Sequence, residues 1–209
     1  MQLIQGRGSV SLWRMATKTQ KSRGSTWIDD VQQRLNPRAA RREVAAELDE
    51  KFRSGSPPDP QPEGFLAGRL LTTTWWDPAD ALVARVARLY MPWLGKSFDT
   101  ESSSGVNVLR TSARRPMKVL WPRYVLEREL ADRLEAFPFK TRMEEGAVDT
   151  GLKVLKIDYD FDANPNFLIR SILDELVQID DGVYLGKILL RRKERFHPIG
   201  FFSLESPRG

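Results

Sequence analysis

The sequence predicts a mainly β (α+β) protein with an antiparallel, barrel-like sheet, a few helices and an N-terminal helical arm. Between residues 65 and 204 short segments of strand character recur, and several of them contain a glycine. Two apolar runs, 183–192 and 196–204, are separated by Lys193-Glu194-Arg195, which predicts a C-terminal hairpin. Repeated short antiparallel strands that end in a hairpin are typical of closed or half-closed barrels.

Three segments precede the predicted barrel. Residues 1–24 are polar and contain five basic and no acidic residues, which predicts a disordered basic tail. Residues 25–53 predict a helical arm of two helices, because apolar residues recur every four positions on either side of Asn36-Pro37. Residues 54–64 contain four prolines and two glycines and predict a linker. The barrel-like domain then covers residues 65–209.

Local patterns predict the first elements of that domain. Residues 65–74 predict a strand, and a helix begins at Asp77-Pro78 and ends at Met91-Pro92. Residues 93–99 and 106–110 predict two strands joined by a flexible loop, and residues 117–121 predict another strand. Leucines at 126, 130 and 134 predict a helix over 124–135, and residues 137–143 return to strand character.

The clearest alternation follows at residues 154–161. Leu155, Ile157, Tyr159 and Phe161 share one face, and lysine and aspartate side chains occupy the other. Apolar residues between 168 and 177 then favour a helix over 168–179, although Ile169, Leu173, Val177 and Ile179 would also share one face of a strand. Asp181-Gly182 predicts the turn into the hairpin, and Pro198 is expected at an edge or a bulge.

Composition excludes several classes of function. There is no cysteine, so disulfides, thiolate zinc sites and cysteine nucleophiles are absent, and His197 is the single histidine. Removing the five basic residues of the tail from the total of 33 leaves 28, equal to the 28 acidic residues. This neutral balance argues against a nucleic-acid partner for the folded domain. No apolar run is long enough for a transmembrane segment. We expect a cytoplasmic protein; the alternatives for residues 1–24 are an organelle-targeting segment, or a start at Met15.

Acidic residues suggest chemistry in two ways, and neither pattern is complete. Asp158, Asp160 and Asp162 have the spacing of a calcium loop, but Ala163 and Ile169 stand where glycine and glutamate are required. Asp158, Asp174 and Glu175 could form a carboxylate pair with His197 as acid or base. We therefore predict no metal site, no cofactor and no assigned catalytic residue.

Two stretches resemble known bacterial protein groups. The Trp93-x-Gly95-Lys96-x-Phe98 run is similar to the core of the GXWXG-type domain, although Met91 stands where that pattern has its leading glycine. Tyr159-Asp160, Asp174 and Leu185-Gly186 follow the order of the domain of unknown function that commonly accompanies it. The resemblance implies a calycin-like barrel that binds lipophilic molecules, and it supplies no catalytic residues.

The sequence favours a non-enzymatic barrel that binds a small hydrophobic or amphipathic, lipid-like ligand. Aromatic residues and one lysine are the candidate lining: Trp93, Lys96, Tyr159 and Tyr184. A first alternative is an enzyme that acts on a similar ligand through aspartate and His197, which requires His197 to face a cleft near Asp158 or Asp174. A second alternative is an adaptor that docks a partner through the helical arm.

Overall fold

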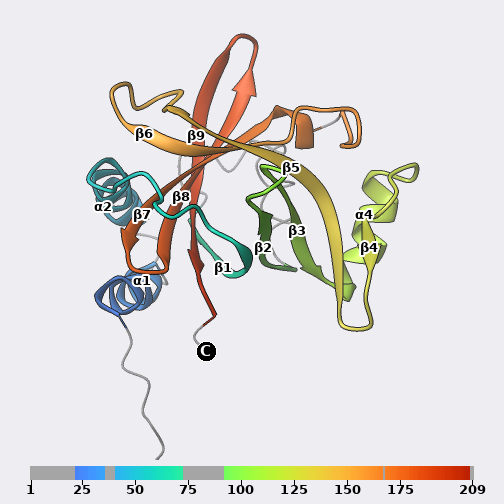
Figure 1. The fold of residues 1–209 in the computed structure, drawn as a ribbon, viewed down its shortest axis with the longest axis horizontal. Helices are drawn as coiled ribbons and strands as arrows, with labels where there is room; N and C mark the ends of the chain where they lie inside the picture. Colours follow the sequence, from blue (N-terminus) through green and yellow to red (C-terminus); the bar gives the residue numbers. More distant parts are fainter. Residues whose placement is uncertain (1–21, 36–40, 73–91, 167, 208–209) are drawn as a thin grey trace, which may run out of the picture.

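The computed structural model describes residues 22–35, 41–72, 92–166 and 168–207, and within them the chain forms a closed antiparallel barrel (Figure 1). Two helices precede the barrel, α1 (Arg23–Arg34) and α2 (Arg41–Arg53). The first strands are β1 (Gly64–Thr72), β2 (Trp93–Asp99) and β3 (Ser104–Arg110), followed by η2 (Thr111–Ala113), α4 (Arg114–Leu120) and β4 (Arg128–Glu129). The remaining elements are β5 (Arg133–Glu145), β6 (Lys153–Asp158), η3 (Ile169–Ser171), β7 (Ile172–Asp180), β8 (Val183–Arg192) and β9 (Arg195–Glu205).

Strand pairing closes the sheet into a ring. The order runs β3-β2-β1-β9-β8-β7-β6-β5, and β5 pairs back with β3, so that eight strands form the barrel. The short β4 pairs with β5 beside this ring. All of these pairs are antiparallel. Closure gives β3 and β5 a partner on each side, which removes the exposed edges of an open sheet.

Two apolar clusters lie on opposite faces of the sheet. The inner cluster fills the barrel with alternate residues of all eight strands, such as Leu66, Leu155 and Phe202. The outer cluster packs α1 and α2 against the strands and includes Leu48, Phe52 and Phe201. Burying side chains of this size contributes about 1.5–3 kcal/mol each. The two predicted helices of residues 25–53 therefore lie on the outer wall of the barrel (Figure 1).

Several predicted elements are confirmed. The barrel, the C-terminal hairpin of β8 and β9, and the strands at 93–99 and 106–110 are present. Pro198 pairs with Leu189 at a register shift between Ile188 and Leu189, which is the bulge expected for a residue without an N–H donor. The Pro-rich segment is held to the barrel by hydrogen bonds: Ser56 exchanges backbone bonds with Gln178, and Glu63 accepts bonds from Thr100. The helix predicted from Asp77 to Met91 lies outside the described residues.

The predictions for residues 117–121 and 124–135 are wrong. Residues 114–120 form helix α4, which buries Met117 and leaves Val119 exposed. The chain then turns and enters β4 and β5, where the leucine at 134 is buried inside the barrel opposite Leu109. The spacing of four between leucines is a local signal, and the long pairing of β5 with β3 and β6 overrides it.

The helix favoured over 168–179 is also wrong, because the segment forms η3 and then strand β7. Leu176 faces the inner cluster, and Val177 faces the outer cluster under the helices. A strand that is covered on both faces is apolar at consecutive positions, and this pattern resembles a helical stripe.

Candidate functional site

A bulge in β2 lets both Trp93 and Lys96 face into the barrel. Trp93 pairs with Leu109 and Gly95 with Val108, so one extra residue lies between them. Lys96 and Phe98 then face inward in the regular alternation, and the bulge turns Trp93 inward as well. Gly95 has a φ of 151°, and a Cβ there would lie 1.9 Å from the carbonyl oxygen of Leu66. This position therefore requires glycine.

Lys96 lies inside the barrel in a polar cluster. Its Nζ is 2.9 Å from Oδ2 of Asp174, and both side chains have 0% exposure. Nζ also donates a hydrogen bond to Oδ1 of Asn107 at 3.0 Å and another to the hydroxyl of Tyr159. The Tyr159 hydroxyl in turn donates to Oδ2 of Asp174 at 3.0 Å. These four residues, named here the Lys96 cluster, come from β2, β3, β7 and the end of β6.

Asn107 links the Lys96 cluster to the surrounding wall. Its Oδ1 accepts from Nε1 of Trp93 at 3.2 Å, and its Nδ2 donates to the carbonyl of Phe137 at 3.1 Å and to the Tyr159 hydroxyl at 3.2 Å. An unsatisfied polar group at this depth would cost about 1–3 kcal/mol, so this network offsets much of the cost of burial. Oδ1 of Asp174 is the exception, since it is buried and has no hydrogen-bond partner among the described residues.

Aromatic rings enclose the ammonium group of Lys96. Nζ lies 5.1–5.4 Å from four ring centroids, those of Trp93, Phe139, Tyr159 and Phe202. Glycines make room for three of these rings, because a Cβ at Gly68, Gly105 or Gly186 would lie 2.1–2.5 Å from ring atoms of Trp93, Phe139 or Phe202 respectively. These three strand glycines therefore allow the rings to pack around one buried cation.

Burial sets the electrostatics of this cluster. Removal from water lowers the pKa of Lys96, and the neighbouring Asp174 carboxylate opposes that shift by favouring the charged ammonium. The pair is neutral as a whole and is shielded from solvent by the rings. Lys96 is therefore already matched by an anion of the chain itself and is not a vacant site for an acidic ligand.

A small cavity adjoins the cluster. Its volume is about 30 Å³, it is partly open to the outside, and its lining is mainly apolar. The described lining residues are Trp93, Asn107, Leu109, Phe137, Tyr159, Ile169 and Ile172. Such a volume holds a water molecule or a group of methyl size. Complete ligand pockets measure about 300–1,000 Å³, so this cavity is suited to one end of a molecule.

The structure brings three of the four predicted site residues together. Lys96 contacts both Trp93 and Tyr159, and these two aromatic residues line the cavity. Lys96 lies behind this lining. Tyr184 belongs to the same inner core, where burial raises the pKa of its hydroxyl. In the described part of the chain, no hydrogen bond or ring contact joins Tyr184 to the Lys96 cluster.

Sequence reasoning missed Asn107 and the pairing of Asp174 with Lys96. Asn107 is the polar residue of an otherwise apolar inward set that includes Leu109, and this interruption was an available signal. Asp174 was considered as an acid or base, but it is an ion-pair partner for Lys96. Its neighbour Glu175 faces the other side of the sheet, so the two do not form a carboxylate pair.

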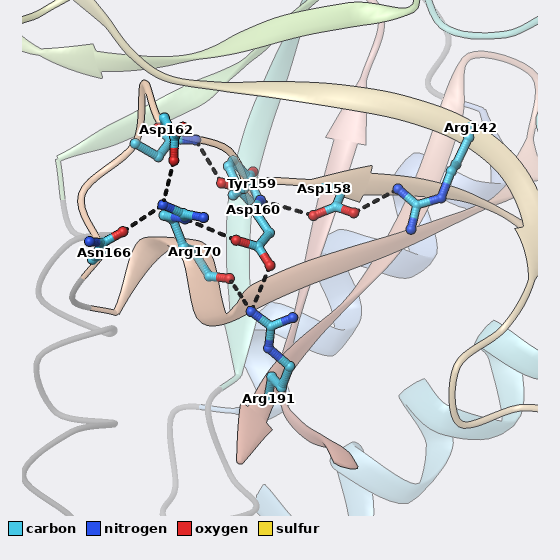
Figure 2. A network of polar contacts seen from close by, with 9 residues as sticks. Arg142, Asp158, Tyr159, Asp160, Asp162, Asn166, Arg170 and Arg191 are labelled. Carbon is cyan, nitrogen blue, oxygen red and sulfur yellow. Dashed lines mark hydrogen bonds and ion pairs between the residues drawn. The ribbon is translucent and has the colours of Figure 1, made fainter. Parts of the chain in front are cut away.

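The aspartates at 158, 160 and 162 are paired with arginines (Figure 2). Asp158 contacts Arg142 at 2.7 Å, and Asp160 contacts Arg170 at 2.9 Å and Arg191 at 2.7 Å. The arginines at 191 and 170 hold the pKa of Asp160 below its usual value. Asp162 contacts Arg170 at 2.9 Å. The three carboxylates thus form ion pairs that tie β6 and the following turn to β5, η3 and β8.

Within the described residues, His197 makes no hydrogen bond or ion pair with these groups. It is exposed on β9 beside the hairpin tip, where it lines a surface hollow with residues 192–195. Asp174 is enclosed within the barrel. The geometry required by the aspartate–histidine hypothesis is not present in this arrangement.

A second buried lysine lies on the outer face of the sheet. Lys187 of β8 contacts Oδ1 of Asp49 in α2 at 2.7 Å and the carboxylate of Asp149, and its Nζ is 4.4 Å from the ring centroid of Phe52. Burial lowers the pKa of Lys187. Glu175, opposite Lys187 on β7, is buried too. These contacts hold α2 and the 146–152 turn against the barrel, which is a structural role.

Comparisons with known proteins add little. No protein-family model matches the chain, and no curated protein matches it either. One solved structure, a protein from Thermomonospora curvata, is similar over 86% of this chain and 99% of its own, with 16% identical residues and a TM-score of 0.43. The resemblance of WLGKSF to GXWXG-type domains stays a prediction. In the described ranges, every helix is too short or too polar to cross a membrane.

Proposed function

We propose that the barrel binds a small hydrophobic or amphipathic molecule whose apolar end enters the cavity beside the Lys96 cluster. The observation that carries the proposal is the partly open, mainly apolar cavity inside a closed barrel. Its aromatic wall suits an alkyl or ring group, and Asn107 and Tyr159 supply the polar atoms that would orient it. Barrels of eight strands commonly enclose one small ligand.

The charges of the interior decide which end of the ligand enters. Lys96 and Asp174 neutralise each other at 2.9 Å, so an entering carboxylate or amine would have to displace a charged partner at a place where both side chains have 0% exposure. An apolar end meets no such cost. We therefore assign any charged head group to the mouth of the cavity and the alkyl end to its base.

The two other hypotheses receive less support from the structure. An enzyme that uses His197 would need a carboxylate partner for that residue. Among the described residues, His197 makes no ion pair or hydrogen bond with an aspartate or glutamate, and it is exposed on the hairpin. An adaptor that docks through the apolar faces of α1 and α2 would need those faces to be free. Ile28, Val31, Leu48 and Phe52 each have 0% exposure because they already pack on the barrel.

Calorimetric titration with primary alcohols of increasing chain length tests the proposal. Each methylene that enters an apolar site contributes about 0.8 kcal/mol, so affinity should rise about fourfold for each carbon that the cavity encloses. Because the cavity is only about 30 Å³, the rise should stop within the shortest alcohols. Ile172→Trp fills the cavity and should abolish binding, and Val148→Trp adds the same side chain at a site that does not line the cavity. Absence of binding by the wild type, or equal affinities of both variants, would refute the proposal.

A further inference from the structure

The segment that follows β3 forms a projection at the side of the barrel. Helix α4 and strand β4 lie together there, on the side opposite α1 and α2 (Figure 1). The projection, defined here as residues 110–129, is anchored by Trp121 and Tyr124. Their ring centroids lie 5.2 Å and 5.1 Å from that of Phe137, a residue that also lines the cavity. The projection therefore adjoins the part of the barrel where the cavity lies.

Positive charge is concentrated on the projection. It contains six basic residues and two acidic ones, Glu127 and Glu129, whereas residues 25–209 as a whole are neutral. Arg114 is paired with Glu129 at 2.8 Å, and Arg128 lies 3.7 Å from Glu135. The other four basic side chains are exposed and make no ion pair within the described part of the chain: Arg110, Arg115, Lys118 and Arg123. This surface is suited to an anionic partner.

Exposed apolar side chains lie among these charges. Val119 is 82% exposed and Val125 is 78% exposed, and both belong to the projection. Val119 lies one helical turn after Arg115, on the side of α4 away from the buried Met117. Segments that bind at a membrane surface combine a basic helix face with exposed apolar residues. Helix α4 has such a face, and Val125 in the next loop is a second exposed apolar residue.

A phosphate backbone of nucleic acid fits this surface less well than a bilayer does. Nucleic acid would pair with the four exposed cations and leave both valines in water. An anionic bilayer satisfies both features, because lipid phosphates meet the basic side chains while the valines enter the boundary between head groups and acyl chains. Short apolar residues that penetrate only this boundary need no membrane-spanning helix.

We propose that the projection binds the surface of an anionic phospholipid bilayer, with Arg115, Lys118 and Arg123 at the level of the lipid phosphates and Val119 and Val125 inserted between head groups. This assignment stands apart from the ligand proposed for the cavity, since it rests on the charge and exposure of residues 110–129. The protein binds reversibly in the plane of the membrane, and its affinity falls as salt rises because the charges are exposed.

Co-sedimentation of the full chain with vesicles tests the assignment. We expect binding to vesicles of phosphatidylcholine mixed with phosphatidylserine and little binding to pure phosphatidylcholine. Each basic residue near an anionic surface contributes about a fivefold change in affinity, so the triple variant R115Q/K118Q/R123Q should bind about a hundredfold more weakly. The variant V119S/V125S should bind more weakly by about tenfold per valine that is fully inserted.

A matched control separates the projection from charge in general. R42Q/K153Q/R195Q removes the same charge from exposed positions elsewhere and should bind as the wild type does. The basic residues of positions 1–24 are present in every variant, so their contribution cancels in this comparison. The assignment is overturned if both triple variants lose vesicle binding equally, or if R115Q/K118Q/R123Q loses none. It is also overturned if R115Q/K118Q/R123Q loses binding to duplex DNA while its vesicle binding is unchanged.

Discussion

Breaking the Lys96–Asp174 pair from one side should destabilise the barrel strongly. Lys96→Met keeps an unbranched side chain of similar length among the four rings, so the packing changes little. It leaves the Asp174 carboxylate at 0% exposure with a single described hydrogen-bond donor, the Tyr159 hydroxyl. An uncompensated buried charge of this kind costs about 3–5 kcal/mol. Domains of this size are stable by about 5–15 kcal/mol, so the loss is measurable.

The double variant K96M/D174N separates charge from shape. The amide that replaces the carboxylate at position 174 carries no net charge, so the second substitution should recover at least about 2 kcal/mol of the loss caused by Lys96→Met. Urea unfolding followed by tryptophan fluorescence measures the three variants and the wild type under one set of conditions. A loss below about 1 kcal/mol for Lys96→Met, or additive losses in the double variant, would refute a buried and coupled ion pair.

Two further predictions concern positions that the structure constrains. Gly95→Ala should lower the free energy of unfolding by more than about 3 kcal/mol, because its Cβ would lie 1.9 Å from the Leu66 carbonyl oxygen. Gly64→Ala, at a φ of 68° with open space around it, should lower it by only about 1–2 kcal/mol. Equal losses in urea unfolding would contradict the bulge. Burial raises the pKa of Glu175 above 4.5, so its contribution to stability is full below pH 4.5 and is lost as pH rises through the raised pKa. The stability of Glu175→Gln relative to the wild type should therefore rise as pH increases from 4.5 to neutrality. Urea unfolding at several pH values measures this difference in unfolding free energy, and a difference that stays constant or falls would contradict the raised pKa.

Local sequence patterns were sufficient for most strands and for an antiparallel barrel, which they predicted as closed or half-closed. They failed where a segment's environment is set by distant parts of the chain. Strand β7 is apolar at consecutive positions because helices α1 and α2 cover its outer face, and that cover is not visible in the segment itself. The leucines near 130 suggested a helix, but pairing with β3 and β6 places residues 133–145 in the barrel wall.

The site was predictable only in part for a similar reason. Trp93 and Lys96 are three residues apart, so strict alternation places them on opposite faces of a strand, and only the bulge at Gly95 brings both inside. Asn107 and Asp174 both form a hydrogen bond with the Tyr159 hydroxyl. These bonds depend on the closure of the barrel through β3, β5, β6 and β7. No local pattern encodes that register.

Ligand binding in the barrel can be measured by native mass spectrometry of the purified wild-type protein, before and after incubation with a short primary alcohol. We expect a species heavier than the bare chain by one ligand, and the loss of that species in Ile172→Trp but not in Val148→Trp. A wild-type protein that carries no ligand as purified and gains none on incubation would contradict ligand binding in the barrel.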